Sequence, residues 1–153
     1  MFEAKNKPRL KSRQRLRRKL TEALQPIEDK ITAYVRATYP QACNRGGGRS
    51  CRACYSLIRR YLPDERQTHN IHRDGQAVVT AVVSLSDYGR DFLGGLYVAA
   101  NGVERQVIAL RKGDAIIHQY DLLHGVEVND IREDHPSMRW SWILWFQVGQ
   151  LVG

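Results

Sequence analysis

Hydrophobic residues in the first 38 positions follow the spacing of an α-helix. They recur three or four residues apart before and after Pro26, so that each set falls on one helical face. The positions are Leu16, Leu20, Ala23 and Leu24, followed by Ile27, Ile31, Tyr34 and Val35. Because proline interrupts the helical hydrogen-bond ladder, the pattern predicts two amphipathic helices that are joined or kinked at Gln25-Pro26.

The pattern changes after residue 55 to short apolar runs separated by turn-forming residues. Seven runs have the length of a strand, and no helical periodicity lies between them, which favours a sandwich or barrel over a βαβ sheet. The expected strands are 56–62, 76–85, 95–99, 106–110, 114–120, 125–128 and 138–148. The fold class is therefore mainly β with N-terminal helices.

A chain of 153 residues is expected to form one domain. Its composition, 42% hydrophobic and 26% charged, is typical of soluble globular proteins. We divide the chain into a basic helical segment that packs on the β-rich part (residues 1–40), a loop rich in glycine and cysteine (41–54), and a β-rich core that carries the chemistry (55–153).

The net charge of +8 is concentrated at the N-terminus. Residues 1–19 contain nine basic residues and one acidic residue, whereas the rest of the chain contains 15 of each and is neutral. We interpret the basic segment as a solvated helix face. The alternatives are a nuclear-import patch or a contact surface for nucleic acid or an acidic partner. Residues 5–19 hold no aromatic side chain for base stacking, so nucleic-acid binding would be an accessory role.

The sequence contains neither a run of 18 apolar residues nor an apolar segment behind the basic N-terminus. We therefore expect an intracellular protein, cytoplasmic or nuclear, that does not contact a membrane. The oligomeric state is not predicted.

Three cysteines, Cys43, Cys51 and Cys54, lie within 12 residues. A structural zinc site needs four ligands, which here would require His69 as the fourth. We interpret the cysteines as reduced thiols that bind no metal, with the zinc site as the alternative.

His72 and Asp74 are two residues apart, so on a strand both side chains would point to the same face. Two imidazoles and one carboxylate can bind one face of a ferrous ion and leave the other face open. We take His124 as the third ligand because it follows an apolar strand at Leu122-Leu123. His118 is its nearest competitor, and we expect His69 and His135, in polar surroundings, to be exposed.

Arg139 and Ser141 share one face of the last apolar run by the same two-residue period. A buried arginine is costly unless it is paired with an anion, and this strand contains no acidic residue. Two interpretations are open: a salt bridge to a carboxylate of a neighbouring strand, or a bidentate clamp on the carboxylate of a ligand.

Five blocks of the chain, in the same order, resemble the Fe(II)/2-oxoglutarate-dependent oxygenases, and most closely their prolyl-hydroxylase-like branch. The resemblance covers about residues 55–148. The blocks are His72-Arg73-Asp74, Phe92-Leu93-Gly94-Gly95, Lys112-Gly113-Asp114-Ala115-Ile116-Ile117, Leu122-Leu123-His124-Gly125-Val126 and Arg139-Trp140-Ser141.

The resemblance implies a double-stranded β-helix (jelly-roll) barrel backed by N-terminal helices. It makes His72, Asp74 and His124 the ligands of Fe(II). It makes Arg139, with Ser141, the residue that binds the far carboxylate of 2-oxoglutarate. The implied reaction is hydroxylation of a C–H bond with O2, in which 2-oxoglutarate becomes succinate and carbon dioxide; ascorbate is a further candidate cofactor. The implied substrate is a prolyl residue of a peptide or protein.

The chain departs from the family pattern in three places. The interval of 15 residues between His124 and Arg139 is longer than usual. Val82-Val83-Ser84 lacks the tyrosine that many prolyl-hydroxylase-like members use for the co-substrate, so Tyr61 becomes the candidate, with core packing as its alternative role. Leu96 stands where the family often has a glutamate after the Gly-Gly pair. The carboxylate of Asp74 indicates a hydroxylase and not a halogenase.

Two other functions stay open from the sequence. One is an oxygenase of the same family that acts on a free amino acid or another small molecule. The other is a non-catalytic barrel that binds a protein or nucleic acid, which the retention of His72, Asp74, His124 and Arg139 argues against.

Overall fold

The computed structural model describes residues 7–43, 52–131 and 136–147. Within these ranges the chain forms one α-helix, one short 3₁₀ helix and eight strands. The helices are α1 (Lys7–Thr38) and η1 (Pro40–Cys43). The strands are β1 (Tyr55–Tyr61), β2 (Thr68–His72), β3 (Val79–Ser84), β4 (Leu93–Val98), β5 (Gln106–Val107), β6 (Ala115–Gln119), β7 (His124–Asn129) and β8 (Arg139–Phe146).

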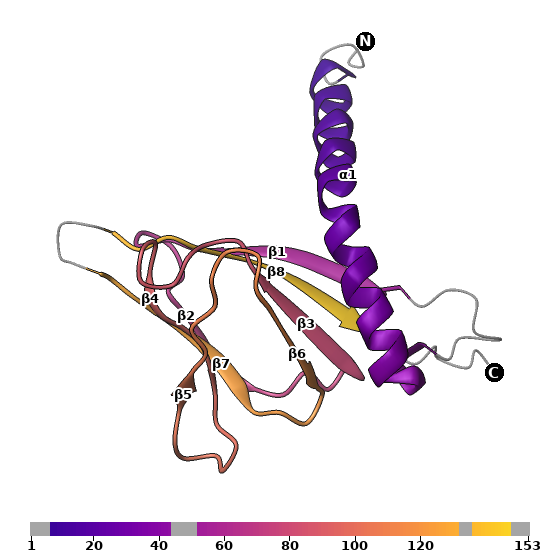
Figure 1. Ribbon diagram of the computed structural model, residues 1–153. Coiled ribbons are helices and arrows are strands. Elements are labelled where there is room, and N and C mark those ends of the chain that lie inside the picture. The colour runs from indigo at the N-terminus through magenta and orange to yellow at the C-terminus, as the bar shows by residue number, and fades with distance from the viewer. Residues whose placement is uncertain (1–6, 44–51, 132–135, 148–153) are drawn as a thin grey trace, which may run out of the picture.

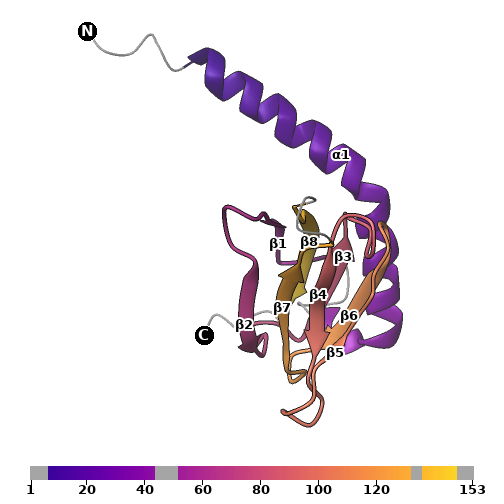
Figure 2. The same cartoon turned by 90° about the vertical axis from the view of Figure 1, so that its left-hand side faces the viewer.

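The strands form two antiparallel four-stranded sheets that face one another (Figures 1 and 2). The strand order is β1-β8-β3-β6 in one sheet and β2-β7-β4-β5 in the other. Each sheet therefore draws strands from both the beginning and the end of the β-rich part, as in an eight-stranded jelly roll built from two Greek keys. The predicted fold class, mainly β with the double-stranded β-helix arrangement, is confirmed.

All seven predicted strands are present, with ends that differ by a few residues, but the sequence pattern missed β2. None of the residues of β2 is fully buried, and Ile71, its one aliphatic residue, is 40% exposed. The strand therefore lacks the apolar alternation by which a half-buried strand is recognised. It forms because its backbone pairs with β7.

The prediction of two separate helices is wrong, because α1 runs continuously through Pro26, although its axis bends along its length (Figure 2). Pro26 lies on an exposed side of the helix, as does Glu22 one turn earlier. The Glu22 carbonyl, which lacks a helical donor at this point, can therefore accept a hydrogen bond from water.

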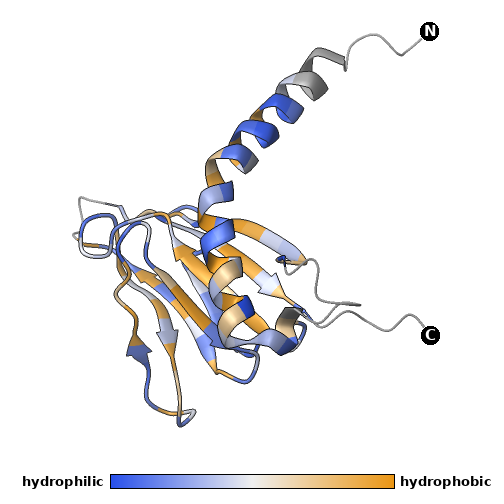
Figure 3. Cartoon of the chain, turned by 45° about the vertical axis from the view of Figure 1, so that its right-hand side comes forward, coloured by the Kyte–Doolittle hydropathy of each residue, from blue (hydrophilic) through white to orange (hydrophobic). Residues whose placement is uncertain are grey.

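Only the second half of α1 packs on the β-rich part. Ile31 and Val35 are buried against the outer face of the β1-β8-β3-β6 sheet, where they contact the cluster that includes Val79, Ala81 and Leu144. Residues 12–23 are exposed, and this half of the helix extends away from the strands (Figures 1 and 2). Figure 3 shows the same division, with polar residues along the extended half and apolar residues where the helix meets the sheet.

A second, smaller core lies between the two sheets. It contains Tyr61 from β1, Leu96 from β4, Val126 and Val128 from β7, and Phe92 just before β4. Strands β3 and β8 thus contact the helix on one face and the space between the sheets on the other, as the two-residue period of a strand requires.

Several residues singled out in the sequence lie outside the described part of the chain. These are the side chain of Cys43, residues 44–51 with Cys51 and the glycine run, and His135. Cys54 is an exposed free cysteine. Neither of the helices in the described ranges combines the length and the apolar character that a membrane span requires.

The packing of α1 predicts that substitutions in its two halves differ in their effect on the free energy of unfolding. Ile31→Ala removes a side chain that is 6% exposed, and should lower the free energy of unfolding by about 2–5 kcal/mol. Leu16→Ala, where the side chain is 69% exposed, should change it by less than about 0.5 kcal/mol. Urea titration monitored by tryptophan fluorescence measures both, and equal losses would contradict the packing of the second half alone.

Candidate metal centre and anion site

His72, Asp74 and His124 converge at one point between the sheets. Their ligand-type atoms all lie within 4.8 Å of one another. His72 is the last residue of β2, His124 is the first residue of β7, and Asp74 follows β2 by two residues. The three residues that the sequence proposed as ligands are thus brought together, and these side chains have the spacing of a metal site.

The antiparallel pairing of β2 with β7 aligns the two histidines. His72 lies directly opposite His124, and their ring centroids are 4.4 Å apart. Two details of the sequence interpretation are wrong. Asp74 lies after the end of β2 and not on a strand, and Leu122-Leu123 lie in the irregular segment between the turn at Tyr120-Asp121 and β7, not on an apolar strand.

The backbone fixes which nitrogen each histidine offers. Nδ1 of His72 lies 2.8 Å from the Asn70 carbonyl oxygen, and Nδ1 of His124 lies 3.0 Å from the Leu122 carbonyl oxygen. A carbonyl can only accept, so each Nδ1 carries the proton and each Nε2 keeps a free lone pair. Burial lowers the pKa of His124, which favours the neutral ring that a metal needs.

Asp74 is held by the opposite sheet. Its Oδ2 accepts hydrogen bonds from the Thr80 hydroxyl at 2.7 Å and from the Trp145 indole at 3.2 Å. Thr80 and Trp145 face each other across β3 and β8. Burial raises the pKa of Asp74, but the hydrogen bond from Thr80, the neighbouring His124 and the hydrogen bond from Trp145 outweigh it, and the pKa lies below its usual value.

The remaining carboxylate oxygen of Asp74 points toward the histidines. Oδ1 is 3.4 Å from Nε2 of His72, and Oδ2 is 3.8 Å from Nε2 of His124. Within the described part of the chain, no hydrogen-bond donor occupies Oδ1. Two imidazoles that each direct Nε2 to the site and one carboxylate with a free oxygen make the donor set that ferrous oxygenases use, so these residues fit Fe(II).

Two other histidines surround this group. The expectation that His69 is exposed is wrong, because it is half-buried on β2 and its ring lies 4.5 Å from that of His72. Burial, followed by the charges of His72, Arg59 and Arg66, lowers its pKa to about 4. His118 is buried with its ring 4.6 Å from that of His124, and its Nε2 has no hydrogen-bond partner among the described residues.

A cavity of about 60 Å³ joins the three candidate ligands to the two candidate anion-binding residues, Arg139 and Ser141. The residues of β8 that line it alternate along the strand, which explains why they share its inner face. The lining residues are Arg59, Tyr61, His69, His72, Asp74, Thr80, Val82, Leu96, His124, Val126, Arg139, Ser141, Ile143 and Trp145.

Arg139 is 2% exposed and pairs with no carboxylate among the described residues. Its guanidinium carbon lies 5.4 Å from the centre of the Tyr61 ring and 5.7 Å from that of Phe92, and its Nη1 lies 3.5 Å from the Ser141 hydroxyl. Burial lowers its pKa. Of the two interpretations of Arg139, the salt bridge to a neighbouring strand is therefore not present within the described ranges.

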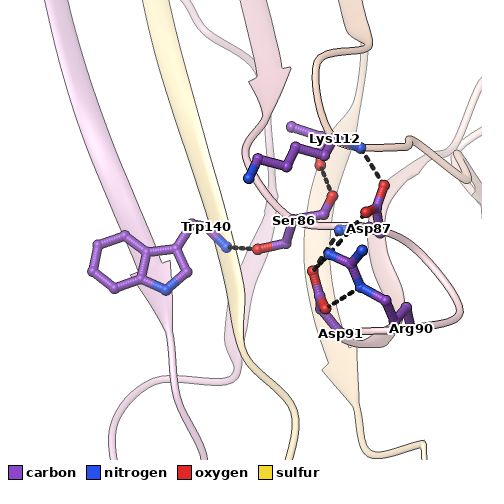
Figure 4. A network of polar contacts seen from close by, with 7 residues as sticks. Ser86, Asp87, Arg90, Asp91, Lys112 and Trp140 are labelled. Carbon is purple, nitrogen blue, oxygen red and sulfur yellow. Dashed lines mark hydrogen bonds and ion pairs between the residues drawn. The ribbon is translucent and has the colours of Figure 1, made fainter.

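The β3–β4 loop holds the start of β8, and with it Arg139. Ser86 accepts a hydrogen bond from the Trp140 backbone at 3.0 Å, and the Asp91 carbonyl accepts one from the Met138 backbone. Asp87 and Asp91 are tied to each other and to Arg90, and Asp87 also accepts from the Lys112 backbone at 2.7 Å (Figure 4). The backbone on both sides of Arg139 is therefore fixed.

Tyr61 lies where the sequence expected a co-substrate residue, although its ring also belongs to the core. It is 1% exposed and stands directly opposite Arg139 in the β1–β8 pairing. Ser141, one inward position further along β8, is equally buried. The three side chains form a small polar group between aromatic rings.

Gly125, next to His124, is required by close packing. A Cβ atom at this position would lie 2.4 Å from the Tyr97 hydroxyl oxygen and 3.0 Å from the His69 carbonyl oxygen. Tyr97 therefore packs directly over the backbone of β7 beside His124. This accounts for the glycine in the Leu-Leu-His-Gly-Val block.

Sequence reasoning missed the two residues that orient Asp74. Trp145 could have been found, because it continues the two-residue period of Arg139 and Ser141 along β8. Thr80 carried no such signal, since a threonine in an apolar run is an ordinary strand residue. Arg59 and His69 were also missed as cavity residues.

No protein-family model matches the chain, and no curated protein matches it. Among solved structures, it is similar to a 2OG-Fe(II) oxygenase-family oxidoreductase from Burkholderia pseudomallei, with 22% identity, coverage of 61% of this chain and 43% of that one, and a TM-score of 0.48. A prolyl hydroxylase from Trichoplax adhaerens, in complex with a hypoxia-inducible-factor peptide, has 15% identity, covers 77% of this chain and 55% of that one, and has a TM-score of 0.46.

A third similar structure is a double-stranded β-helix protein from Klebsiella pneumoniae, with 16% identity, coverage of 69% of this chain and 84% of that one, and a TM-score of 0.38. This chain therefore spans less than two thirds of the two oxygenase structures.

The support of Asp74 can be tested through metal affinity. Thr80→Val keeps the shape of the side chain but removes the 2.7 Å hydrogen bond, and should weaken binding of Fe(II) or Co(II) by about 10–100-fold. Thr68→Val, at an exposed position of β2, should leave the affinity unchanged. Anaerobic titration against a competing chelator measures both, and unaltered affinity in Thr80→Val would mean that Asp74 does not need this support.

Proposed function

We propose that this chain is an iron(II)- and 2-oxoglutarate-dependent oxygenase that hydroxylates a C–H bond. One observation carries the proposal. Arg139, a buried guanidinium without a carboxylate partner in the described residues, lines the same cavity as the His72, Asp74 and His124 group. A metal site alone is compatible with many reactions, but a metal site beside an unpaired buried cation calls for a ligand that carries a carboxylate.

In this proposal, His72, Asp74 and His124 hold Fe(II). Both histidines offer Nε2, because their Nδ1 protons are engaged by backbone carbonyls, and Asp74 offers the oxygen that Thr80 and Trp145 leave free. Bound iron supplies the activation of O2, for which side chains alone have no suitable chemistry. Thr80 and Trp145 keep the carboxylate oriented and ionised.

Arg139 would bind the far carboxylate of 2-oxoglutarate, with Ser141 and Tyr61 as further hydrogen-bond donors. Both residues line the same cavity, and Tyr61 faces Arg139 across the strand pair. The rings of Tyr61 and Phe92 exclude water from the guanidinium, which strengthens its attraction for an anion. No carboxylate of the described residues pairs with Arg139, so most of its N–H donors stay available to the ligand.

The finer proposal is that the hydroxylated group is a prolyl residue of a peptide or protein. It is supported by the resemblance of the sequence blocks to the prolyl-hydroxylase-like branch. The competing substrate is a free amino acid or another small molecule. Succinate release should be measured with proline-containing peptides, free amino acids and oligonucleotides, and mass spectrometry should detect the gain of one oxygen in the substrate.

The metal assignment predicts a spectroscopic result. Anaerobic addition of Fe(II) and 2-oxoglutarate should give a weak visible charge-transfer band, because the 2-keto acid would bind the metal directly. His72→Ala or Asp74→Ala should abolish the band, whereas Asp64→Ala, which removes an exposed carboxylate, should retain it. A band that persists in both ligand variants would exclude this site.

The role of Arg139 predicts opposite effects on binding and on stability. Arg139→Met should weaken 2-oxoglutarate binding by at least about 100-fold, because a charge-assisted pair is lost, while metal affinity is largely kept. Without ligands, the variant should unfold at the same denaturant concentration as the wild type or a higher one, since a buried unpaired charge has been removed. Strong destabilisation with unchanged 2-oxoglutarate binding would make Arg139 a structural residue.

A further inference from the structure

The cavity contains a second arginine whose charge no carboxylate of the described residues balances. Arg59 lies on the inner face of β1, two residues before Tyr61, and is half-buried in the cavity wall. Across the strand pair it faces Ser141. Within the described residues it forms no hydrogen bond or ion pair with a carboxylate. An arginine in this position is available to a ligand.

Arg59 lies at a different level of the cavity from Arg139. Along β1, Tyr61 stands opposite Arg139, and Arg59 is displaced by two residues, about 6.6 Å, toward the end of the sheet where Trp145 contacts Asp74. Its charge acts on His69, whose ring contacts that of His72. Arg59 is therefore on the side of the candidate metal ligands, whereas Arg139 is enclosed by Tyr61 and Phe92.

This part of the cavity lies at the edges of the two sheets. β1 and β2 are the edge strands on this side, and the chain passes directly from one to the other. Arg66 lies in that connection, two residues before β2, and is exposed. Arg59, His69 and His72 are only partly buried, so an incoming ligand can reach this wall from solvent.

Two of the nearby acidic residues, Glu65 and Asp74, are engaged elsewhere, and the exposed Asp64 forms no ion pair with Arg59 or Arg66 in the described part of the chain. Glu65, next to Arg66, binds Arg60 on the outer face of β1, with a distance of 3.0 Å between Oε2 and the Arg60 Nε. Asp74 accepts its hydrogen bonds from Thr80 and Trp145. Within the described residues, therefore, neither Arg59 nor Arg66 is paired with a carboxylate.

The charges of Arg59 and Arg66 are not needed to neutralise the metal and co-substrate in the proposed complex. In the complex of that proposal, the two positive charges of Fe(II) and the one of Arg139 are matched by the negative charge of Asp74 and the two of 2-oxoglutarate. Neither Arg59 nor Arg66 is needed for that balance. An unmatched guanidinium in a partly buried wall is stabilised when a second anion binds.

We infer that Arg59, with Arg66 at the rim, binds a carboxylate of the primary substrate. This inference rests on the proposed function and narrows its substrate to one that carries a carboxylate near the hydroxylated C–H bond. The carboxylate can belong to an acidic side chain of a peptide or to a free amino acid. Arg59 would be a specificity-determining residue, separate from the co-substrate site at Arg139.

The test measures binding without turnover. The protein is loaded with Zn(II) in place of Fe(II) and saturated with 2-oxoglutarate, and ligands are added in matched pairs that differ only in one charge. One arm compares proline-centred pentapeptides that carry glutamate or glutamine beside the proline. The other arm compares free L-proline with L-prolinamide. Calorimetry gives the ratio of affinities for the acid and the amide in each pair.

The expected result is a preference for the acid of about tenfold or more in the wild type, in one of the two arms. Arg59→Gln should reduce this ratio to near one, and Arg66→Gln should reduce it in part. Arg60→Gln is the matched control, because it removes the same charge from the neighbouring position on the outer face of β1 and should keep the preference. The arm that responds identifies the source of the carboxylate.

Two outcomes would overturn the inference. One is the absence of an acid preference in every pair. The other is a larger loss of 2-oxoglutarate affinity than of substrate affinity in Arg59→Gln, which would make Arg59 a co-substrate residue. Binding of 2-oxoglutarate to the Zn(II)-loaded wild type is measured first, and its failure would count against the proposed function and not against Arg59 alone.

Discussion

The candidate metal centre depends on the hydrogen bonds that Asp74 receives from the opposite sheet. The two histidines belong to β2 and β7, whereas the donors to Asp74, Thr80 and Trp145, belong to β3 and β8. The three ligand-type side chains can therefore meet only when both sheets are folded and correctly opposed. Formation of the site therefore requires the two sheets to pack on each other, and this packing gives the small cavity its defined geometry.

The two charged groups of the cavity, Asp74 and Arg139, are each held by neutral groups and not by each other. Asp74 is satisfied by neutral donors, so its negative charge remains available to a cation. Arg139 is enclosed by aromatic rings and one hydroxyl, so its positive charge remains available to an anion. The protein keeps these two groups from pairing with each other by attaching Arg139 and Trp145 to opposite ends of β8. Charged groups that are held in place without a partner of opposite charge are more typical of binding sites than of structural ion pairs.

Much of this arrangement could be predicted from the sequence, for reasons visible in individual residues. The strands with apolar runs were found because burial imposes that pattern, and the His72, Asp74 and His124 group was found because its residues occur in recognisable blocks. Strand β2 was missed because pairing with β7, and not burial, creates it. Thr80 was missed because its role depends on register between β3 and β8, which one sequence does not display.

The errors at Pro26 and His69 have a similar origin. A proline ends a helix only where its missing hydrogen bond cannot be replaced, and Pro26 is exposed to water. The polar neighbours of His69 suggested an exposed side chain, but on the edge strand β2 this ring lies against that of His72. In both cases the environment, which depends on the tertiary fold, decided the outcome.

The number of residues between His124 and Arg139 depends on the length of the connection between β7 and β8, whereas the direction of the Arg139 side chain depends on strand pairing. The base of this connection is closed where Ser137 bonds to the Asn129 carbonyl at 2.6 Å and to the Asp130 carboxylate at 2.8 Å, while the direction of Arg139 is set by pairing with β1 and β3. The interval between His124 and Arg139 can therefore grow without moving either side chain. Within β8 itself, a single inserted residue would exchange the cavity face with the helix-covered face. Substitutions and insertions in this chain must therefore keep the alternation of inward and outward residues along β8. The number of residues in the connection between β7 and β8 can change.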